Sequence, residues 1–365
     1  MSRAAKMILP LTLALIGYLG FWPVPVDPQP WQAPAAPSLA ANSGLANLHP
    51  ISLKGDTGPE HIALGPGGKL YTGVESGRIL RMNADGSDMQ VLASTGGRPL
   101  GMTFDAAGTL IVADAYKGLL SVTSDGKVTV LADHVDGDPI RLADGVDVAR
   151  NGKIYFSDAT RRFTPQMDHG GTSYAAMLDV IEQSASGRLL EYDPATSAVR
   201  VLAQGISFAN GVLLSADQEW LYFCETGRYR VWKVSVHADR LDIRQPSPQA
   251  RVVLDNLPGF PDNLTRGQGG KLWLGLAGPR NQLDDMAQHP YLRKLMLRVP
   301  QALWPPIKTY GHVLAFTEDG KIVADLQDPG GASGATTGLT EGPERMYVQS
   351  IDSHSIGWLP RPRGE

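Results

Sequence analysis

Six equivalent positions of a repeated pattern hold mostly oxygen-bearing side chains. Each lies eleven residues, or twelve in the fourth case, before the second member of an apolar or aromatic pair such as Leu70-Tyr71 or Leu272-Trp273. The six positions hold Glu60, Leu100, Asp144, Asn210, Asp262 and Thr336, and the preceding residue is always Pro or Ala. Carboxylate and amide oxygens at four of these positions are suited to holding a hard cation.

The repeat itself predicts an all-β fold, a six-bladed β-propeller. In the first copy, short strands over 61–64, 69–74, 78–83 and 89–94 are separated by turns rich in Gly, Asp and Asn. Four antiparallel strands in each period of roughly 40–45 residues are typical of a propeller blade. Six copies predict six blades within residues 48–360. The last copy lacks a fourth strand, which we expect residues 50–53 to supply and so to close the ring.

Two longer spacings predict insertions, over about 162–186 in the third blade and about 280–310 in the fifth. In the first insertion Tyr174, Met177, Leu178 and Ile181 follow the i, i+3, i+4, i+7 pattern of one helix face. The second contains an apolar run from Leu292 to Leu303. These helical insertions either pack on the blade edges or form a lid over the channel mouth.

The first strand of each blade should line the central channel of the propeller. Glu60, Asp144, Asn210 and Asp262 would then converge from four blades at one end of the channel, with Asn263 beside them. Three carboxylates in one confined site require a cation, because their mutual repulsion would otherwise force protonation. A shell made only of oxygen ligands favours Ca²⁺, or another hard divalent cation. A purely structural ion remains the alternative to a catalytic one.

Residues 1–26 have the features of a signal anchor or signal peptide. Arg3 and Lys6 precede a charge-free, mostly apolar run over 7–22, and a Pro/Ala-rich linker follows over 27–47. No small-x-small cleavage site directly follows Trp22. We therefore favour an uncleaved membrane anchor with the propeller on the exported side, periplasmic or extracytoplasmic. Secretion after signal cleavage is the alternative.

Composition argues against some other classes. The net charge is −4, and no basic stripe with interleaved aromatic residues is present, so we do not expect a nucleic-acid partner. The single cysteine, Cys224, cannot form an intrachain disulfide. The sequence leaves the oligomeric state open.

Between about residues 50 and 360 the chain resembles the strictosidine synthase-like group, which is related to SMP-30/gluconolactonase proteins and paraoxonases. It is most similar to the adipocyte plasma membrane-associated type, which also has an N-terminal anchor. The similar stretches are Gly58-Pro59-Glu60, Arg98-Pro99-Leu100-Gly101, residues 113–118, Phe208-Ala209-Asn210-Gly211-Val212 and residues 258–263. The resemblance implies six blades and, in the lactonase and paraoxonase branches, a catalytic Ca²⁺. It places the family's ligands on Glu60, Asn210, Asp262 and Asn263, with Asp144 where Asn is usual.

Two departures from the related activities narrow the function. The catalytic glutamate of strictosidine synthases falls on Thr337, which cannot perform acid–base chemistry, so the amine–aldehyde condensation is disfavoured. The histidine used by paraoxonases falls on Leu100. The resemblance then leaves a calcium-dependent hydrolase of lactones or other esters. By analogy with the lactonase branch, Asp262 would take the proton of the attacking water.

Other polar residues could contact a substrate or support the site. They are Asp114, Tyr116 and Lys117 of the second blade, His169 of the third-blade insertion, and Glu225 and Arg230 of the fourth blade. Each could equally be structural. The main alternative function is a membrane-tethered, non-catalytic propeller that binds a small ligand or a partner protein. An enzyme requires an open, partly apolar pocket above the ion, whereas a scaffold can have that mouth sealed.

Overall fold

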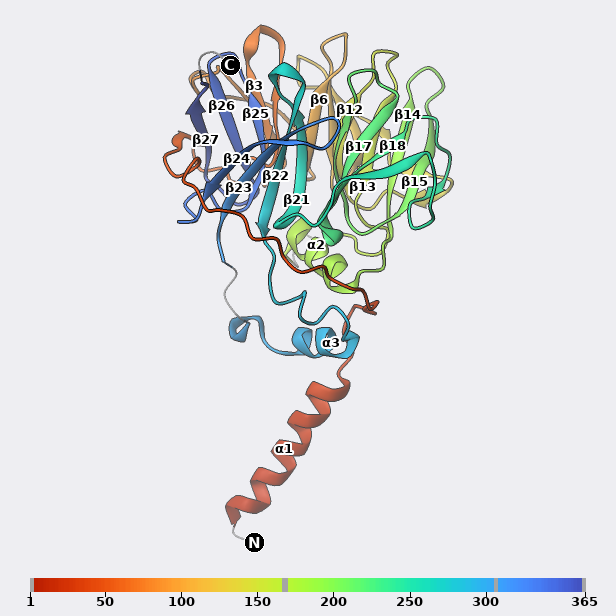
Figure 1. Ribbon diagram of the computed structural model, residues 1–365, viewed down its shortest axis with the longest axis vertical. Helices are drawn as coiled ribbons and strands as arrows, with labels where there is room; N and C mark the ends of the chain where they lie inside the picture. Colours follow the sequence, from red (N-terminus) through yellow and green to blue (C-terminus); the bar gives the residue numbers. More distant parts are fainter. Residues whose placement is uncertain (1–2, 166–169, 305–307, 363–365) are drawn as a thin grey trace.

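Short strands, most of the inner ones buried along their whole length, form six small antiparallel sheets, and these sheets are arranged around one axis as the predicted six-bladed propeller (Figure 1). The computed structural model describes residues 3–165, 170–304 and 308–362 of the 365-residue chain. The first strands of neighbouring blades contact one another in a closed ring around the axis. This ring forms the wall of the central channel.

The blades follow one another along the chain. Blade 1 contains β2 (Ile62–Leu64), β3 (Leu70–Gly73), β4 (Arg78–Met82) and β5 (Gln90–Ser94), and blade 2 contains β6 (Pro99–Phe104), β7 (Leu110–Asp114), β8 (Gly118–Val122) and β9 (Val128–Ala132). Blade 3 contains β12 (Ala143–Val148), β13 (Ile154–Asp158), β14 (Gly187–Asp193) and β15 (Ala198–Ile206), and the short β19 (Leu241–Asp242) pairs in parallel with β15. A small hairpin, β10 (His134–Val135) and β11 (Asp138–Pro139), precedes blade 3.

The other three blades continue the pattern. Blade 4 contains β16 (Ala209–Leu214), β17 (Trp220–Glu225), β18 (Arg230–Ser235) and β20 (Ala250–Leu254), and blade 5 contains β21 (Gly259–Arg266), β22 (Lys271–Pro279), β23 (Gly311–Thr317) and β24 (Ile322–Asp328). Blade 6 combines β25 (Thr336–Glu341), β26 (Arg345–Ser350) and β27 (Ser355–Pro360) with β1 (His49–Ser52). Because Ile51 of β1 pairs with Ile356 of β27, the ring closes as the sequence predicted.

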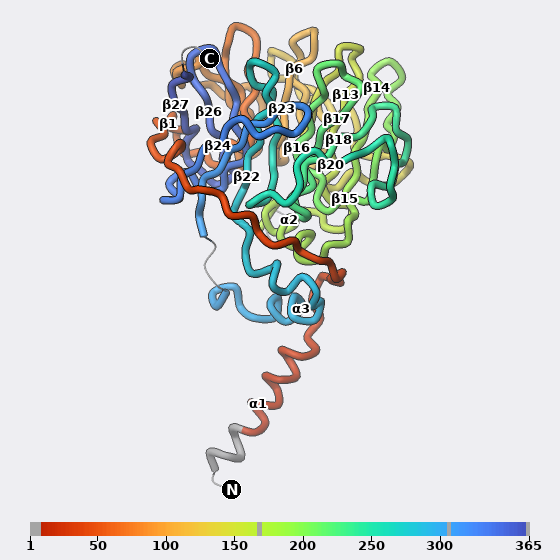
Figure 2. Tube along the Cα trace, in the orientation of Figure 1, coloured from red at the N-terminus to blue at the C-terminus, as the bar shows by residue number. Residues whose placement is uncertain are grey.

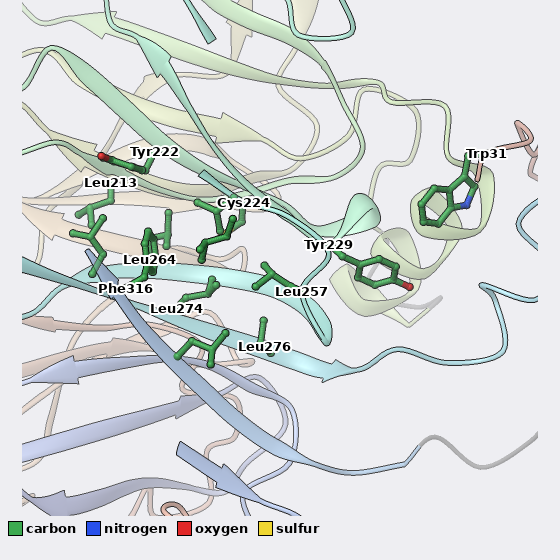
Figure 3. Packing of buried hydrophobic residues seen from close by; sticks show 14 of the residues in the cluster. Trp31, Leu213, Tyr222, Cys224, Tyr229, Leu257, Leu264, Leu274, Leu276 and Phe316 are labelled. Atoms are coloured by element: carbon green, nitrogen blue, oxygen red, sulfur yellow. The ribbon is translucent and has the colours of Figure 1, made fainter. Parts of the chain in front are cut away.

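Apolar side chains fill the space between adjacent blades. Between blades 4 and 5, Leu213, Tyr222 and Cys224 pack with Leu264 and Phe316, as Figure 3 shows. Cys224 is fully buried in this cluster, and burial raises the pKa of its thiol well above the usual value. It therefore packs as a small apolar residue.

The predicted helical insertions are present in blades 3 and 5. They contain α2 (Gly171–Glu182) and α3 (Pro290–Arg298), and both lie at the same end of the propeller (Figure 1). The N-terminal helix α1 (Arg3–Phe21) extends away from that end and contacts α3. Within the residues that the structure describes, no helix combines the length and apolar character that a membrane crossing requires.

The segment between α1 and β1 runs along the side of the propeller (Figure 2). Trp31 is buried against Tyr229, with ring centroids 6.1 Å apart, and Leu45 is buried at the edge of blades 5 and 6. Figure 3 shows Trp31 at the outer end of the cluster, beyond Tyr229. Residues 27–47 are thus packed along the blades.

Candidate functional site

The first strands of most blades share an irregularity in pairing at one end of the channel. We call the six equivalent positions of the repeat the column positions. In blades 2 to 6 the pairing register between the first and second strands shifts, and the shift always falls at or next to the column position. Such a bulge leaves a residue without a direct cross-strand partner and bends the strand locally. The same device therefore acts on the column residues of five blades.

Glycines directly after the column residues let neighbouring blades approach closely. A Cβ added to Gly145 would lie 2.7 Å from the Cα of Gly211, and one on Gly211 would lie 2.6 Å from the Cα of Asn263. Those distances exclude any side chain. The motif Asn210-Gly211 thus pairs a polar side chain for the site with a residue small enough to close the ring.

The predicted ligand residues meet at one end of the channel. Glu60, Asp144, Asn210 and Asp262 come from four different blades, are all buried, and line one cavity of about 290 Å³. Asn263 is also buried and lies beside Glu60, because its Nδ2 donates to the Glu60 carbonyl oxygen at 3.1 Å and to its carboxylate Oε1. The structure thus brings together all five residues that the sequence suggested as ligands.

Part of this polar cluster has no hydrogen-bond partner. Among the described residues, Glu60 Oε2, Asp144 Oδ1 and Asn210 Oδ1 are buried and unpartnered. The Asn210 side chain does hydrogen-bond to Asp262. Buried polar atoms are rarely left unpaired, since each costs roughly 1–3 kcal/mol. We call the polar end of the cavity, formed by the five predicted ligand residues, the floor. Three buried, unpartnered oxygens on this floor indicate a ligand that supplies positive charge.

The electrostatics of the floor point the same way. Burial, followed by repulsion from Glu60, raises the pKa of both Asp144 and Asp262 well above the usual value. Burial also raises the pKa of Glu60 to about 7, although Arg98 opposes the shift. Three buried carboxyl groups of this kind become jointly ionised only near a strong positive charge.

The carboxylate oxygens, taken together with the amide oxygens of Asn210 and Asn263, form a set of donors that fits a hard divalent cation. Within the described chain, no group of three His, Cys, Asp or Glu side chains is placed to hold a metal ion by itself. A cation at this floor would therefore need Asn210 and Asn263 in addition to the carboxylates. Calcium accepts such mixed and irregular oxygen shells.

Arg98 is a fixed positive charge beside the floor that the sequence pattern did not predict. It is almost fully buried, donates from Nη2 to the Gly58 carbonyl oxygen at 2.9 Å, and pairs through Nε with Glu75 at 3.0 Å. Its charge opposes the rise that burial causes in the pKa of both Glu60 and Asp144. Arg98 therefore partly offsets the negative charge of the site.

The cavity above the floor is mostly apolar. Blade residues and α2 supply its walls, and the strand end and loop after β22 cover it. The apolar or weakly polar lining residues include Leu100, Leu142, Met177, Val180, Phe208, Phe260, Leu283 and Ile351. A carbonyl compound with an apolar body would fit such a space better than a highly charged one. The insertion in blade 3 thus forms part of the cavity wall.

Several lining residues were not predicted, although the sequence contains a signal for them. Leu142, Phe208 and Phe260 lie two positions before Asp144, Asn210 and Asp262, respectively. The three residues occupy equivalent positions of the repeat, so a repeat that brings one of them to this end of the channel brings the others there as well. The repeat therefore could have predicted part of the apolar wall as well as the acidic floor. The α2 residues had no such signal, because an insertion has no counterpart in other blades.

The predicted supporting residues of blade 2 lie outside the cavity lining. Asp114 is buried, and its Oδ1 accepts from the backbone nitrogens of Arg98, Tyr116 and Lys117 at 3.1, 2.9 and 3.1 Å. It therefore shapes the turn between β7 and β8. Tyr116 lies against Gly171 at the start of α2, and Lys117 is exposed.

The predicted supporting residues of blade 4 also have structural partners. Glu225 accepts from the backbone nitrogen of Ser207 at 3.2 Å and from Nε1 of Trp232 at 2.8 Å. Arg230 pairs with Asp255 at 3.0 Å. Neither residue lines the cavity. His169 lies outside the described residues.

Thr337 lies beside Glu60. Its Oγ1 donates to the Glu60 carbonyl oxygen at 2.5 Å. The position that would hold a catalytic glutamate in a strictosidine synthase is therefore beside the floor, but here it holds a hydroxyl group. His61, by contrast, lines a different cavity of about 580 Å³ at the opposite end of the channel.

Comparisons with known proteins agree with this architecture. The family described as SMP-30/gluconolactonase/LRE-like region matches residues 67–283, and the strictosidine synthase-like N-terminal family matches residues 38–82. Strictosidine synthase-like 7 of Arabidopsis thaliana is 34% identical over 348 residues, which cover 90% of this chain and 87% of that protein. The adipocyte plasma membrane-associated protein of Salmo salar is 33% identical, covering 75% and 68%. The resemblance inferred from the sequence is confirmed.

Solved structures share the fold. A gluconolactonase of Xanthomonas campestris superposes with a TM-score of 0.61 at 19% identity, covering 93% of this chain and 97% of that one. Regucalcin of Agrobacterium tumefaciens, a calcium-binding protein, superposes with a TM-score of 0.55 at 16% identity, covering 87% and 96%. At such low identities the likeness shows the propeller fold alone.

Proposed function

We propose a hydrolytic function for this chain, which belongs to the SMP-30/gluconolactonase/LRE-like family and to its strictosidine synthase-like relatives. The proposed reaction is the calcium-dependent hydrolysis of a lactone or another ester. One observation carries the proposal: unpartnered, buried carboxylate and amide oxygens form the floor of an otherwise apolar cavity. A scaffold that recognises only a partner protein would have no need for an apolar cavity directly above such a floor, so the cavity favours a small-molecule substrate.

Glu60, Asp144, Asn210, Asp262 and Asn263 are the proposed ligands. A bound calcium ion would polarise the ester carbonyl and lower the pKa of an attacking water. The shell would have three carboxylates, because this chain has Asp144 where the family usually has Asn. Its charge favours a divalent over a monovalent cation.

The chain's own residues would perform the remaining steps. Asp262 is the proposed proton acceptor, because it lies on the floor, where its carboxylate could accept a proton from a water beside the proposed ion. The apolar walls contributed by Phe208, Phe260 and Met177 would orient the acyl part of the substrate and exclude bulk water. Two positions lack the ionisable side chains that related enzymes use. Leu100 is at the position that the resemblance gives to the histidine of paraoxonases, and Thr337 is at the position that it gives to the catalytic glutamate of strictosidine synthases.

We also propose that the protein is exported and remains attached to a membrane through α1. The support is the apolar N-terminal run and the exposure of Leu11, Leu13 and Ile16 on α1, which projects away from the propeller (Figure 1). Exposed leucines on an isolated helix are costly in water and favourable in lipid.

The test is hydrolysis of a panel of lactones and aryl esters by the full chain in detergent, with calcium and after chelation. Asp262→Asn should abolish turnover, and Arg150→Ala, at the opposite end of the channel, should leave it unchanged. If nothing is hydrolysed but chelation lowers the melting temperature, the ion is structural and the chain is a binding scaffold. If neither activity nor stability responds to calcium, the ligand set is wrong.

A further inference from the structure

The large exposed hydrophobic side chains are not evenly distributed. Outside α1, the propeller blades expose a few single residues such as Val130, whereas one small region combines several from two separate segments. These residues are Tyr18, Phe21 and Trp22 at the end of α1, and Tyr291, Leu292 and Leu303 of the fifth-blade insertion. We call this set the apolar foot. Leu303 is 72% exposed and Phe21 is 84% exposed, values that a water-facing surface does not favour.

The helix α3 buries two of its three basic residues and exposes two of its apolar ones, while Lys294 is partly exposed and pairs with Asp27. Arg293 and Arg298 are both buried, while Tyr291 and Leu292 are exposed. A helix packed on a protein and facing water normally has the opposite arrangement. The orientation of α3 is thus the one expected if its outer side faces an apolar medium.

Hydrogen bonds fix α3 in this orientation. Arg298 donates from Nε to the Trp22 carbonyl oxygen at 2.7 Å and from Nη1 to that of Leu19 at 3.0 Å. Arg293 donates from Nη1 to the carbonyl oxygen of Ile181, in α2, at 2.6 Å, and from Nη2 to that of Gln29 at 2.7 Å. The two arginines therefore join α3 to α1 on one side and to the cavity-lining helix α2 on the other.

We propose that the apolar foot rests in the interfacial layer of a lipid bilayer, as a second membrane contact besides α1. The occupant is lipid because the foot is continuous with the exposed apolar residues of α1, and because α3 lies across the propeller end of α1 (Figure 1). Aromatic rings mixed with aliphatic side chains suit the boundary between headgroups and acyl chains. This contact goes beyond the proposed tether, since it involves the fifth-blade insertion.

The contact would also set the orientation of the propeller. The cavity lies at the end of the propeller that carries α2, and Arg293 joins α2 to α3. With the foot in the lipid interface, the cavity end faces the membrane and the opposite end of the channel faces away. A flexible tether alone would not fix such an orientation.

The test uses single cysteines, because Cys224 is fully buried in the folded chain. Full-length Leu292→Cys and Leu303→Cys variants are labelled with an environment-sensitive fluorophore and reconstituted into phosphatidylcholine vesicles. Val130→Cys is the matched control, since Val130 is 52% exposed on the outer strand of blade 2. Nitroxide-labelled lipids should quench the probes at 292 and 303 several-fold more than the probe at 130. Equal quenching at all three sites would overturn the proposal.

Two further measurements distinguish a lipid-bound foot from a foot that is free or covered by protein. A Leu13→Cys probe on α1 reports the tether: quenching at 13 but not at 292 or 303 means that α1 enters lipid without the foot, which also overturns the proposal. If a second copy of the chain covers the foot, the probes become shielded with rising protein concentration and remain insensitive to the lipid quenchers; this outcome overturns the proposal as well. Melting temperatures equal to that of the unmodified chain confirm that each variant is folded.

Discussion

The two ends of the channel differ in how the carboxylates that line them are satisfied. The cavity at the α2 end is the smaller, at about 290 Å³ against about 580 Å³ at the opposite end. At the larger end, Asp147 accepts from the backbone nitrogens of Val148 and Leu214, both at 2.8 Å. Glu341 there accepts from Gln268, Trp273 and Lys271. At the smaller end, three buried oxygens have no partner among the described residues.

This difference separates a structural polar cluster from one suited to a ligand. The carboxylates of the larger cavity already have their hydrogen bonds, so they stabilise the blades and need nothing further. The smaller cavity has buried acidic groups with oxygens that lack a partner among the described residues, as the proposed cation site requires. A choice by size alone would select the end of the channel whose carboxylates are already partnered.

The largest expected effect is on catalysis. Asp262→Asn removes the proposed base and one negative ligand, and should lower kcat/KM by about 10²–10⁴-fold. The matched change at the other end, Arg150→Ala, should leave kcat/KM within a factor of about two, because Arg150 lines only the larger cavity. Steady-state hydrolysis by both variants checks this. An equal loss in both would mean that the two ends are not functionally distinct.

The next effect is on stability and its pH dependence. Asp179 of α2 is buried, and burial raises its pKa to about 7, although hydrogen bonds with Thr160 and Ser186 oppose the shift. The folded chain then binds this proton more tightly than the unfolded chain does. Stability should fall as the pH rises from about 4 to about 7, by at most about 4 kcal/mol from this group.

Asp179→Asn should remove that pH dependence and stabilise the protein above pH 7. At the other end, Asp147→Asn should destabilise it by about 1–2 kcal/mol, because one of two backbone donors loses its carboxylate acceptor. Urea unfolding at pH 5, 6, 7 and 8 measures both. A destabilised Asp179→Asn variant at pH 8 would mean that the hydrogen bonds of the carboxylate outweigh the cost of its burial.

A smaller effect concerns the charge of the floor. Asp144→Asn restores the residue usual in the family and removes one of three buried carboxyl groups. Without calcium it should raise stability by about 1–2 kcal/mol, and it should weaken calcium binding at least about ten-fold. Calorimetric titration and melting with a chelator measure the two effects. The exposed Asp133→Asn is the control, and a change of the same size there would point to net charge alone.

The sequence predicted the parts of this site that repeat. Glu60, Asp144, Asn210 and Asp262 were recognisable because each blade presents the same position to the axis, so a shared register translates directly into a shared location. Phe208 and Phe260 were available from the same register, two residues earlier. The β-strands and the closure by residues 49–52 follow from the same periodicity.

Features that occur in only one blade or one insertion could not be predicted in this way. Arg98 has no charged counterpart in the other blades, and its role depends on burial beside Glu60, which is far away in the sequence. Met177 and Val180 reach the cavity only because α2 folds back over the channel end. Asp114 and Glu225 were plausible by residue type, but both accept hydrogen bonds from neighbouring turns and neither lines the cavity. Tertiary contacts, which no local pattern encodes, decide these cases.

The smallest effect tests the apolar wall. Met177→Ala removes side-chain contact on the α2 side of the cavity and should raise KM for an apolar ester about five-fold, from the loss of about 1 kcal/mol of burial. Because the side chain contacts the substrate equally before and during the reaction, kcat should change little. Val148→Ala shortens a side chain that lines the opposite cavity and should leave KM unchanged. If kcat falls with Met177→Ala while KM remains constant, α2 positions the reacting groups and is not simply a wall of the binding cavity.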